Sequence, residues 1–116
     1  MINNNIIDIE QAMALVQGDL SLLRELAETF YKMYPTYLAE IDSAIKEQNS
    51  QKLEKSAHKF KGALKNFAAL ESVDIVFNLE RIGRENSLSE ASEEYQKLEQ
   101  AVERFRQTLS SLVQNV

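Results

Sequence analysis

The chain has 116 residues, a length that suits a single core, and we treat residues 1–116 as one domain. Because it contains no cysteine and only one histidine, disulfides, thiolate chemistry and cysteine-based zinc sites are excluded, and we expect no metal site. The net charge of −5 argues against a general nucleic-acid-binding protein.

The composition favours a compact protein made of long helices. Apolar residues make up 44% of the chain, and there are only three glycines and one proline to interrupt helices. The first residues lack the basic region and apolar core of a signal peptide. No stretch approaches the roughly 18 apolar residues of a membrane span. We therefore expect a soluble, cytoplasmic protein without a membrane segment.

A first short helix is expected over residues 8–18. Asp8 can cap it, Gln11 is placed for a capping box, and Gly18 can end it. Its apolar stripe consists of Ile9, Ala12, Met13 and Val16. Three further apolar residues lie off that stripe, namely Ile6, Ile7 and Leu15. They either pack on neighbouring helices, which is the interpretation we favour, or form a docking surface for a partner.

Pro35 is expected to divide the next apolar pattern into two helices. Asp19 can cap the first of them, whose inward residues are Leu23, Leu26, Ala27, Phe30 and Met33. A proline disfavours helix at the preceding residue and suits the first turn of a new helix. The second helix is thus expected over about residues 35–48, with inward residues Tyr37 or Leu38, Ile41, Ala44 and Ile45.

The helix expected over about residues 51–69 has a regular apolar seam. Its members recur at alternating spacings of four and three and are Leu53, Ala57, Phe60, Leu64 and Phe67. A fifth helix follows a tight connection at residues 70–72. Its apolar residues cover more than one side, so we expect it to be buried between neighbours: Val73, Val76, Phe77, Leu79 and Ile82.

The last helix is expected to be the longest. Ser87 and Glu90 match a capping box at its start. Its apolar pattern comprises Leu88, Ala91, Tyr95, Leu98, Val102, Phe105, Leu109, Leu112 and Val116. Short loops between helices of similar length favour antiparallel neighbours. The sequence therefore predicts an all-α fold, an up-and-down antiparallel four-helix bundle with additional N-terminal helices and about six helices in total.

His58 lies away from the seam of its helix. On a helical wheel it is about 140° from Leu53, on a face that carries Gly62 one turn further on. Three lysines bracket it, namely Lys55, Lys61 and Lys65. A surface histidine on a lysine-rich face is commonly only solvated. Gly62 favours a functional interpretation, because glycine in a helix interior costs about 0.5–1 kcal/mol and no packing on the seam explains it.

These residues suit phosphoryl transfer on an imidazole. A neutral ring nitrogen is a nucleophile, and neighbouring ammonium groups disfavour the imidazolium form by repulsion. Lys61 and Lys65 can stabilise a phosphoryl group on the same helix face. Gly62, which has no side chain, lets a partner's backbone or a phosphoryl group approach the ring of His58.

At these residues the sequence resembles the histidine-containing phosphotransfer (HPt) domain of bacterial phosphorelays. The family pattern Ala-His-x-x-Lys-Gly, with small residues and an Asn-apolar-Gly-Ala ending, is matched by Ala57-His58, Lys61-Gly62, Ala63, Asn66-Phe67 and Ala69. The resemblance extends to the N-terminal helices and to Leu79-Glu80 and Gly83-Arg84 in the following helix. Two departures, Ala68 in place of a glycine and the large Leu64, are interpreted as altered core packing.

The resemblance implies that His58 accepts a phosphoryl group from a receiver-domain aspartate and passes it to another such aspartate. Lys61 would stabilise the phosphoryl oxygens, and Gly62 would leave room for the receiver. The partners implied are the receiver domains of a hybrid sensor kinase and of a response regulator. The receiver would supply Mg²⁺, so this chain would need no cofactor. We expect a monomeric phosphocarrier, and the absence of a P-loop argues against kinase activity of its own.

Two other functions fit parts of the sequence. A non-phosphorylated helical adaptor that binds a signalling partner would explain everything except His58, Lys61 and Gly62. Nucleic-acid binding would use residues 52–68, which carry five lysines against Glu54 alone and so a charge of +4. The rest of the chain then carries −9, which disfavours that function.

Overall fold

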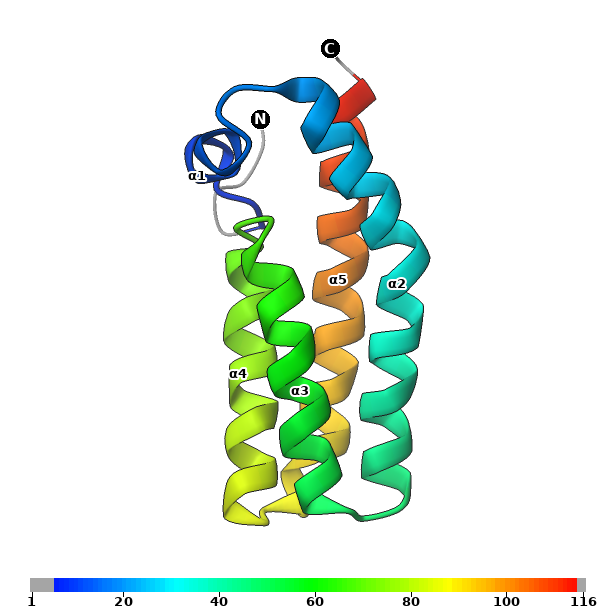
Figure 1. Cartoon of the computed structure of the whole chain (residues 1–116). Helices are drawn as coiled ribbons and strands as arrows, with labels where there is room; N and C mark the ends of the chain where they lie inside the picture. The colour runs from blue at the N-terminus through cyan, green and yellow to red at the C-terminus, as the bar shows by residue number, and fades with distance from the viewer. Residues whose placement is uncertain (1–5, 115–116) are drawn as a thin grey trace.

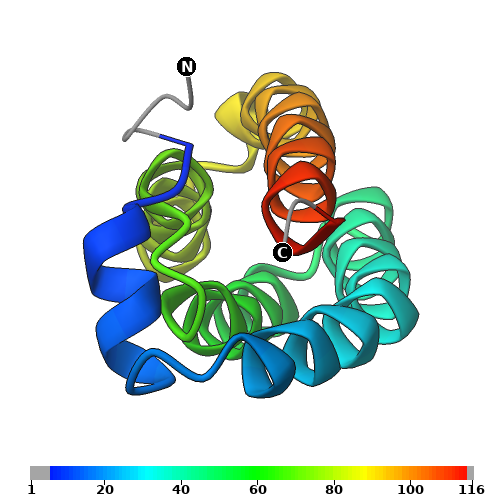
Figure 2. The ribbon, with the colours of Figure 1, turned by 90° about the horizontal axis from the view of Figure 1, so that it is seen from above.

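The fold is an antiparallel helical bundle. The structure is a computed structural model that describes residues 6–114, and this range contains five α-helices: α1 (Ile9–Leu15), α2 (Leu20–Lys46), α3 (Ser50–Lys65), α4 (Leu70–Glu85) and α5 (Ala91–Gln114). A short 3₁₀ helix, η1 (Leu88–Glu90), precedes α5. The four long helices run alternately down and up (Figure 1), and α1 lies crosswise beside the upper ends of α3 and α4 (Figure 2). The predicted all-α four-helix bundle is confirmed.

The predicted break at Pro35 is wrong, because α2 continues through it as one helix. A proline in a helix interior costs about 3 kcal/mol through its missing N–H and its ring clash. Apolar residues on both sides of Pro35 are buried in the same core, including Phe30 and Ile41. Their burial outweighs the local penalty, and the helix changes direction in the middle of its length (Figure 1). The described residues thus form five α-helices, where the sequence predicted about six.

Two of the three predicted N-terminal caps are confirmed. The carboxylates of Asp8 and Asp19 accept hydrogen bonds from the backbone N–H groups of Gln11 and Leu22, each at 3.1 Å. The capping box at Ser87 is wrong, because the side chain of Ser87 makes no cap hydrogen bond and the residues after it form the 3₁₀ helix. In addition, Asn49 caps α3 through a 3.0 Å hydrogen bond from the N–H of Lys52.

The ends of four helices contain a residue in the left-handed conformation. At the end of α3, Ala68 has φ 53°, and the N–H of Ala69 bonds to the carbonyl of Leu64 at 3.4 Å. α3 therefore ends at Lys65, earlier than predicted. The alanine that replaces the family's glycine is buried, and it also occupies a strained backbone position, which core packing alone does not describe. The equivalent residues elsewhere are Gln17, Gln48 and Asn86.

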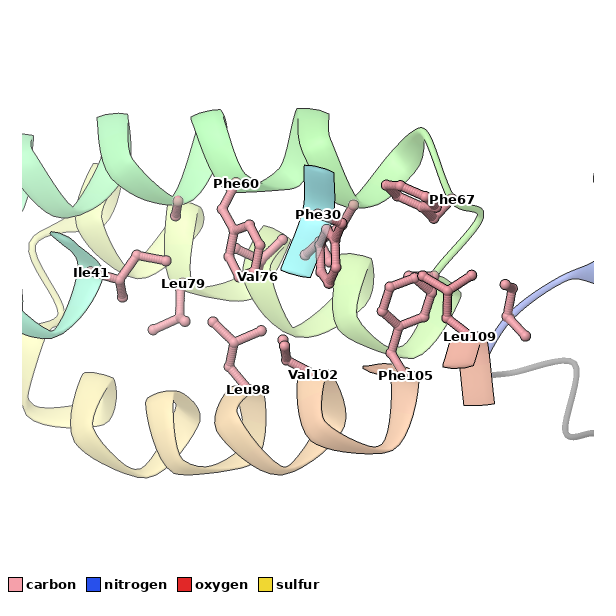
Figure 3. Packing of buried hydrophobic residues seen from close by; sticks show 14 of the residues in the cluster. Phe30, Ile41, Phe60, Phe67, Val76, Leu79, Leu98, Val102, Phe105 and Leu109 are labelled. Carbon is pink, nitrogen blue, oxygen red and sulfur yellow. The ribbon is translucent and has the colours of Figure 1, made fainter. Parts of the chain in front are cut away.

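The core lies between the four long helices (Figure 3). Phe30 is 5.2 Å from both Phe67 and Phe105, measured between ring centroids. The predicted seam of α3 is confirmed, since all of its members are buried: Leu53, Ala57, Phe60, Leu64 and Phe67. Most of the predicted α5 pattern is buried as well, including Leu98, Val102, Phe105 and Leu109, whereas Val116 lies outside the described residues.

Three apolar residues do not lie where their patterns predicted. Phe77 was expected between neighbouring helices and is 51% exposed, and Met33 was expected inward and is also exposed. Of the residues off the first stripe, Ile7 is buried and Ile6 packs against the core, as favoured above, but Leu15 is 50% exposed. None of the described helices has both the length and the apolar character needed to cross a lipid bilayer.

Candidate functional site

His58 lies halfway along α3 on the face opposite the core. The seam residues of α3 turn inward, and the 3.6-residue period therefore carries His58 outward. Its side chain is 72% exposed. The prediction that His58 points away from the seam is confirmed, and the imidazole is open to a partner molecule.

A carboxylate from α4 holds one nitrogen of this ring. The Nδ1 atom of His58 lies 2.8 Å from Oε2 of Glu80, whose side chain is only 4% exposed. In the sequence, Glu80 stands out only as part of the pair Leu79-Glu80, and the helical pattern alone predicts no role for it. The available signal was a single carboxylate between buried apolar residues, Leu79 and Ile82, on an amphipathic helix.

Lys61 contacts the same carboxylate. Its Nζ donates to Oε1 of Glu80 at 2.9 Å, and its side chain is 12% exposed. The same ammonium lies 4.9 Å from the centroid of the Phe77 ring, an arrangement typical of a cation–π contact. The sequence pattern predicted ammonium groups around His58, and the structure adds a carboxylate, which is the charged group bonded to its ring.

Arg84 adds a second cation to Glu80. Its Nη2 atom donates to Oε1 of Glu80 at 3.2 Å, and its Nε donates to Glu54 on α3 at 3.1 Å. Burial raises the pKa of the Glu80 carboxyl, but the hydrogen bonds and charges of Lys61 and His58 outweigh it, so the pKa is lowered overall. Glu80 is therefore ionised at neutral pH.

The two glycines of α3 and α4 serve different purposes. A Cβ atom at Gly62 would meet no surrounding atom of the described structure within 4 Å. A Cβ atom at Gly83 would lie 2.6 Å from the backbone N of Glu54 and 2.8 Å from the carbonyl oxygen of Ser50. Gly83 thus lets α4 approach α3 closely, whereas Gly62 leaves open space on the face of His58.

Lys65 is the last residue of α3, and its side chain is exposed. Its ammonium pairs with no carboxylate of residues 6–114, so it stays available to an anionic partner. The structure therefore brings His58, Lys61 and Glu80 into one bonded group and places Gly62 and Lys65 on the same outer face without a bond to that group.

An apolar hollow of about 300 Å³ borders this face on the side of α2. Its wall from α3 includes Ala63, which directly follows Gly62, and Asn66, which lies one turn beyond Gly62. The other walls come from α1 and α2 and include the exposed side chains of Leu15 and Met33. Leu15, one of the residues considered for docking, thus lines this hollow with an exposed side chain.

The arrangement determines the chemistry available to His58. An ionised carboxylate accepts a hydrogen bond, so Nδ1 carries the hydrogen in the neutral ring. The other nitrogen, Nε2, then carries the lone pair. The site thus presents an exposed nitrogen nucleophile with a buried negative charge behind the ring and open space beside it.

Comparison with known proteins agrees with this geometry. A model of the Hpt domain family matches residues 25–108, which include His58, Gly62 and Glu80. No curated protein and no solved structure gives a significant match. Hpt domains are helical bundles that carry phosphoryl groups on histidine in two-component phosphorelays and interact with receiver domains. Because the match covers well over half of the chain, this protein belongs to the Hpt domain family.

Proposed function

We propose that this chain is a phosphorelay carrier in which Nε2 of His58 accepts a phosphoryl group from the aspartate of one receiver domain and passes it to the aspartate of another. The observation that carries the proposal is the exposed imidazole, 72% open to solvent, whose Nδ1 is bonded to the buried Glu80. A ring held at one nitrogen and open at the other is suited to repeated transfer in both directions.

The transfer step exchanges one bond to phosphorus for another. The lone pair of Nε2 attacks the phosphorus of the receiver's aspartyl phosphate, and the bond between phosphorus and the aspartyl oxygen breaks, leaving the electron pair on the carboxylate. The product is a ring that carries phosphorus on Nε2 and hydrogen on Nδ1. In the return step a receiver carboxylate attacks the same phosphorus, and the electron pair goes back to Nε2. Such a reaction depends mainly on alignment and on stabilising charge.

The surrounding residues receive separate roles in this proposal. Gly62 leaves room for the receiver's backbone beside the phosphoryl group, which the empty space around its Cα supports. Lys65, exposed at the end of α3, attracts the phosphoryl oxygens. Lys61 donates one hydrogen bond to Glu80 in the unphosphorylated protein, and its ammonium has further N–H groups that can bond to the phosphoryl oxygens.

The partners follow from the same chemistry. The receiver domains of a hybrid sensor kinase and of a response regulator provide the two aspartates, and the receiver supplies the Mg²⁺. The chain itself acts as a phosphocarrier without kinase activity, so we expect no labelling by ATP alone. The monomeric state and the cytoplasmic location stay predictions from the sequence.

The direct test uses the purified chain and a panel of receiver domains carrying radioactive aspartyl phosphate. We expect at least one receiver to transfer label to the chain, and the label to be labile in acid and stable in base, as a phosphoramidate is. His58→Gln should remain unlabelled. If His58→Gln accepts as much label as the wild type, the assignment of His58 is wrong.

The alternative function, a non-phosphorylated adaptor, is supported by the apolar hollow beside Leu15 and Met33. It predicts that a signalling partner binds equally well to the wild type and to His58→Ala, and that no receiver labels the chain. A Met33→Glu variant would weaken binding under both hypotheses, so the labelling experiment is the one that separates them.

A further inference from the structure

Lys61 is far less exposed than another lysine on the same helix. Its side chain is 12% exposed, whereas that of Lys59, two residues earlier on α3, is 61% exposed. A lysine commonly lays its aliphatic stem along the protein and keeps its ammonium in water. The low exposure of Lys61 therefore reflects side chains of the neighbouring helix that lie against it.

Phe77 of α4 is one of these side chains. The ammonium of Lys61 lies 4.9 Å from the centroid of the phenyl ring, within the range of a cation–π contact. Phe77 precedes Glu80 by three residues, so both lie on the same face of α4. Glu80 accepts a 2.9 Å hydrogen bond from the same ammonium. Lys61 thus contacts both an aromatic ring and a carboxylate of α4.

Core packing does not account for Phe77. Its side chain is 51% exposed, although the apolar pattern of α4 placed it between neighbouring helices. A phenyl ring that is only half buried gains only part of its transfer free energy. The face of an aromatic ring attracts a cation, which an aliphatic side chain of similar size does not. The contact with Lys61 is therefore an interaction of Phe77 that requires a ring.

We propose that Phe77 is a positioning residue that holds the ammonium of Lys61 beside His58. The proposal rests on the proposed function, in which Lys61 stabilises the phosphoryl oxygens. His58 and Lys61 bond to the two oxygens of one carboxylate, so they are neighbours before transfer begins. A lysine without such a contact would divide its time among many rotamers. With Phe77 in place, Lys61 has its other N–H groups ready for the phosphoryl group.

The first test needs no phosphorylation. Proton–nitrogen correlation spectra of the lysine ammonium groups report how fast each group exchanges its hydrogens with water. At a pH where Glu80 is ionised, we expect slow exchange for Lys61 in the wild type and in Phe77→Tyr, which keeps the ring. Exchange should be several-fold faster in Phe77→Leu, which removes it. An ammonium of Lys61 that exchanges equally slowly in Phe77→Leu would overturn the proposal.

The second test asks whether Phe77 acts on transfer through Lys61. Single-turnover transfer from a phosphorylated receiver is measured for Phe77→Leu, for Lys61→Gln and for the double variant. Phe77→Leu alone should slow transfer roughly threefold to tenfold, and Phe77→Tyr should retain the wild-type rate. In the Lys61→Gln background the loss of the ring should change the rate less than about twofold, because the cation is already absent. Equal slowing in both backgrounds would show that Phe77 acts independently of Lys61.

The dependence on receiver concentration distinguishes positioning from docking. We expect Phe77→Leu to lower the rate at saturating receiver and to leave the half-saturating concentration within about twofold of the wild type. A raised half-saturating concentration with an unchanged maximal rate would make Phe77 a docking contact and contradict the proposal. Leu70→Ala is the matched control, because it truncates another exposed apolar side chain of α4, in the first turn, and should leave both quantities unchanged.

The two tests separate this inference from the function on which it rests. If no receiver labels the wild type, the proposed function fails, while the exchange rates of Lys61 still decide whether Phe77 holds its ammonium. If His58 is labelled and Phe77→Leu matches the wild type in both tests, the function stands and the positioning role of Phe77 is wrong.

Discussion

Gly62 and His58 lie one turn apart on the outer face of α3, and the glycine has no structural reason to be there. A Cβ atom at Gly62 would have no neighbour within 4 Å in the described structure. We therefore expect Gly62→Ala to raise the free energy of unfolding by about 0.5–1 kcal/mol, because alanine favours the helix. In the same variant, phosphoryl transfer should slow by roughly tenfold or more, because the added methyl group shifts the docked receiver away from His58.

Urea unfolding and receiver-to-chain transfer rates measure the two effects of Gly62→Ala. Gln51→Ala is the matched control, since Gln51 is exposed in the first turn of α3, away from His58, and its substitution should leave transfer unchanged. A Gly62→Ala protein that transfers at the wild-type rate would show that the open space has no function in docking.

Glu80 also makes stability depend on pH. Its pKa is lowered in the folded protein, because hydrogen bonds and charges from Lys61 and His58 outweigh the effect of burial. The stability that this provides is complete above the pKa of an unfolded glutamate, about 4.3, and is lost as pH falls through that value toward the lower pKa of the folded state.

We thus expect the wild type to lose stability more steeply than Glu80→Gln between about pH 5 and pH 3, by at most about 1.4 kcal/mol per pH unit. Urea unfolding of both proteins over this range gives the comparison. Other carboxyls with lowered pKa values, such as Glu94 and Glu103, are present in both proteins, so the difference reports Glu80 alone. Parallel pH profiles for the two proteins would contradict the coupling of Glu80 to its cations.

The spacing of α3 and α4 depends on Gly83. A Cβ atom there would collide with backbone atoms of Glu54 and Ser50, which cannot rotate away as a flexible side chain would. We expect Gly83→Ala to lower the free energy of unfolding by about 2 kcal/mol, since overpacking outweighs the gain in helix propensity. Thermal and urea unfolding check this, with Gly62→Ala as the matched control of opposite sign. A Gly83→Ala protein as stable as the wild type would mean that the two helices separate easily.

The outer face of α3 carries much of the positive charge of an acidic molecule. The chain has a net charge of −5, whereas residues 52–68 carry five lysines and one glutamate. Under the proposed function, an acidic receiver surface would be attracted to the face of His58, and such attraction raises the rate of association more than the affinity.

We expect Lys65→Gln to lower the second-order rate of transfer several-fold at low ionic strength and to matter little above about 0.5 M salt, where the Debye length is only a few ångströms. Lys97→Gln makes the same charge change on α5, where Lys97 pairs with Glu94, and should have a small effect throughout. Rapid-quench mixing of the chain with a phosphorylated receiver at several salt concentrations gives the transfer rates. Equal effects of the two variants would show that the charge of α3 does not steer the partner.

Much of the fold and part of the site follow from the sequence. The seam of Leu53, Phe60 and Leu64 repeats with the helical period, so it identifies both the buried side of α3 and the outward position of His58. Predictions from local sequence signals were wrong where tertiary packing opposed them. α2 continues through Pro35 because apolar residues on both sides of it are buried in the core. Ala68 takes the left-handed conformation because the chain must turn there.

The sequence alone determined the helical bundle through the apolar pattern of each helix. The pattern of α3 likewise determined the exposed imidazole and the glycine beside it, because these depend on residues within a few turns of that helix. Only the tertiary structure decided that Glu80 holds Nδ1 of His58, that Lys61 faces this carboxylate, and that Gly83 brings the two helices together. His58 and Glu80 are 22 residues apart on different helices. Their contact depends on the register and separation of α3 and α4, which no periodicity within either helix encodes.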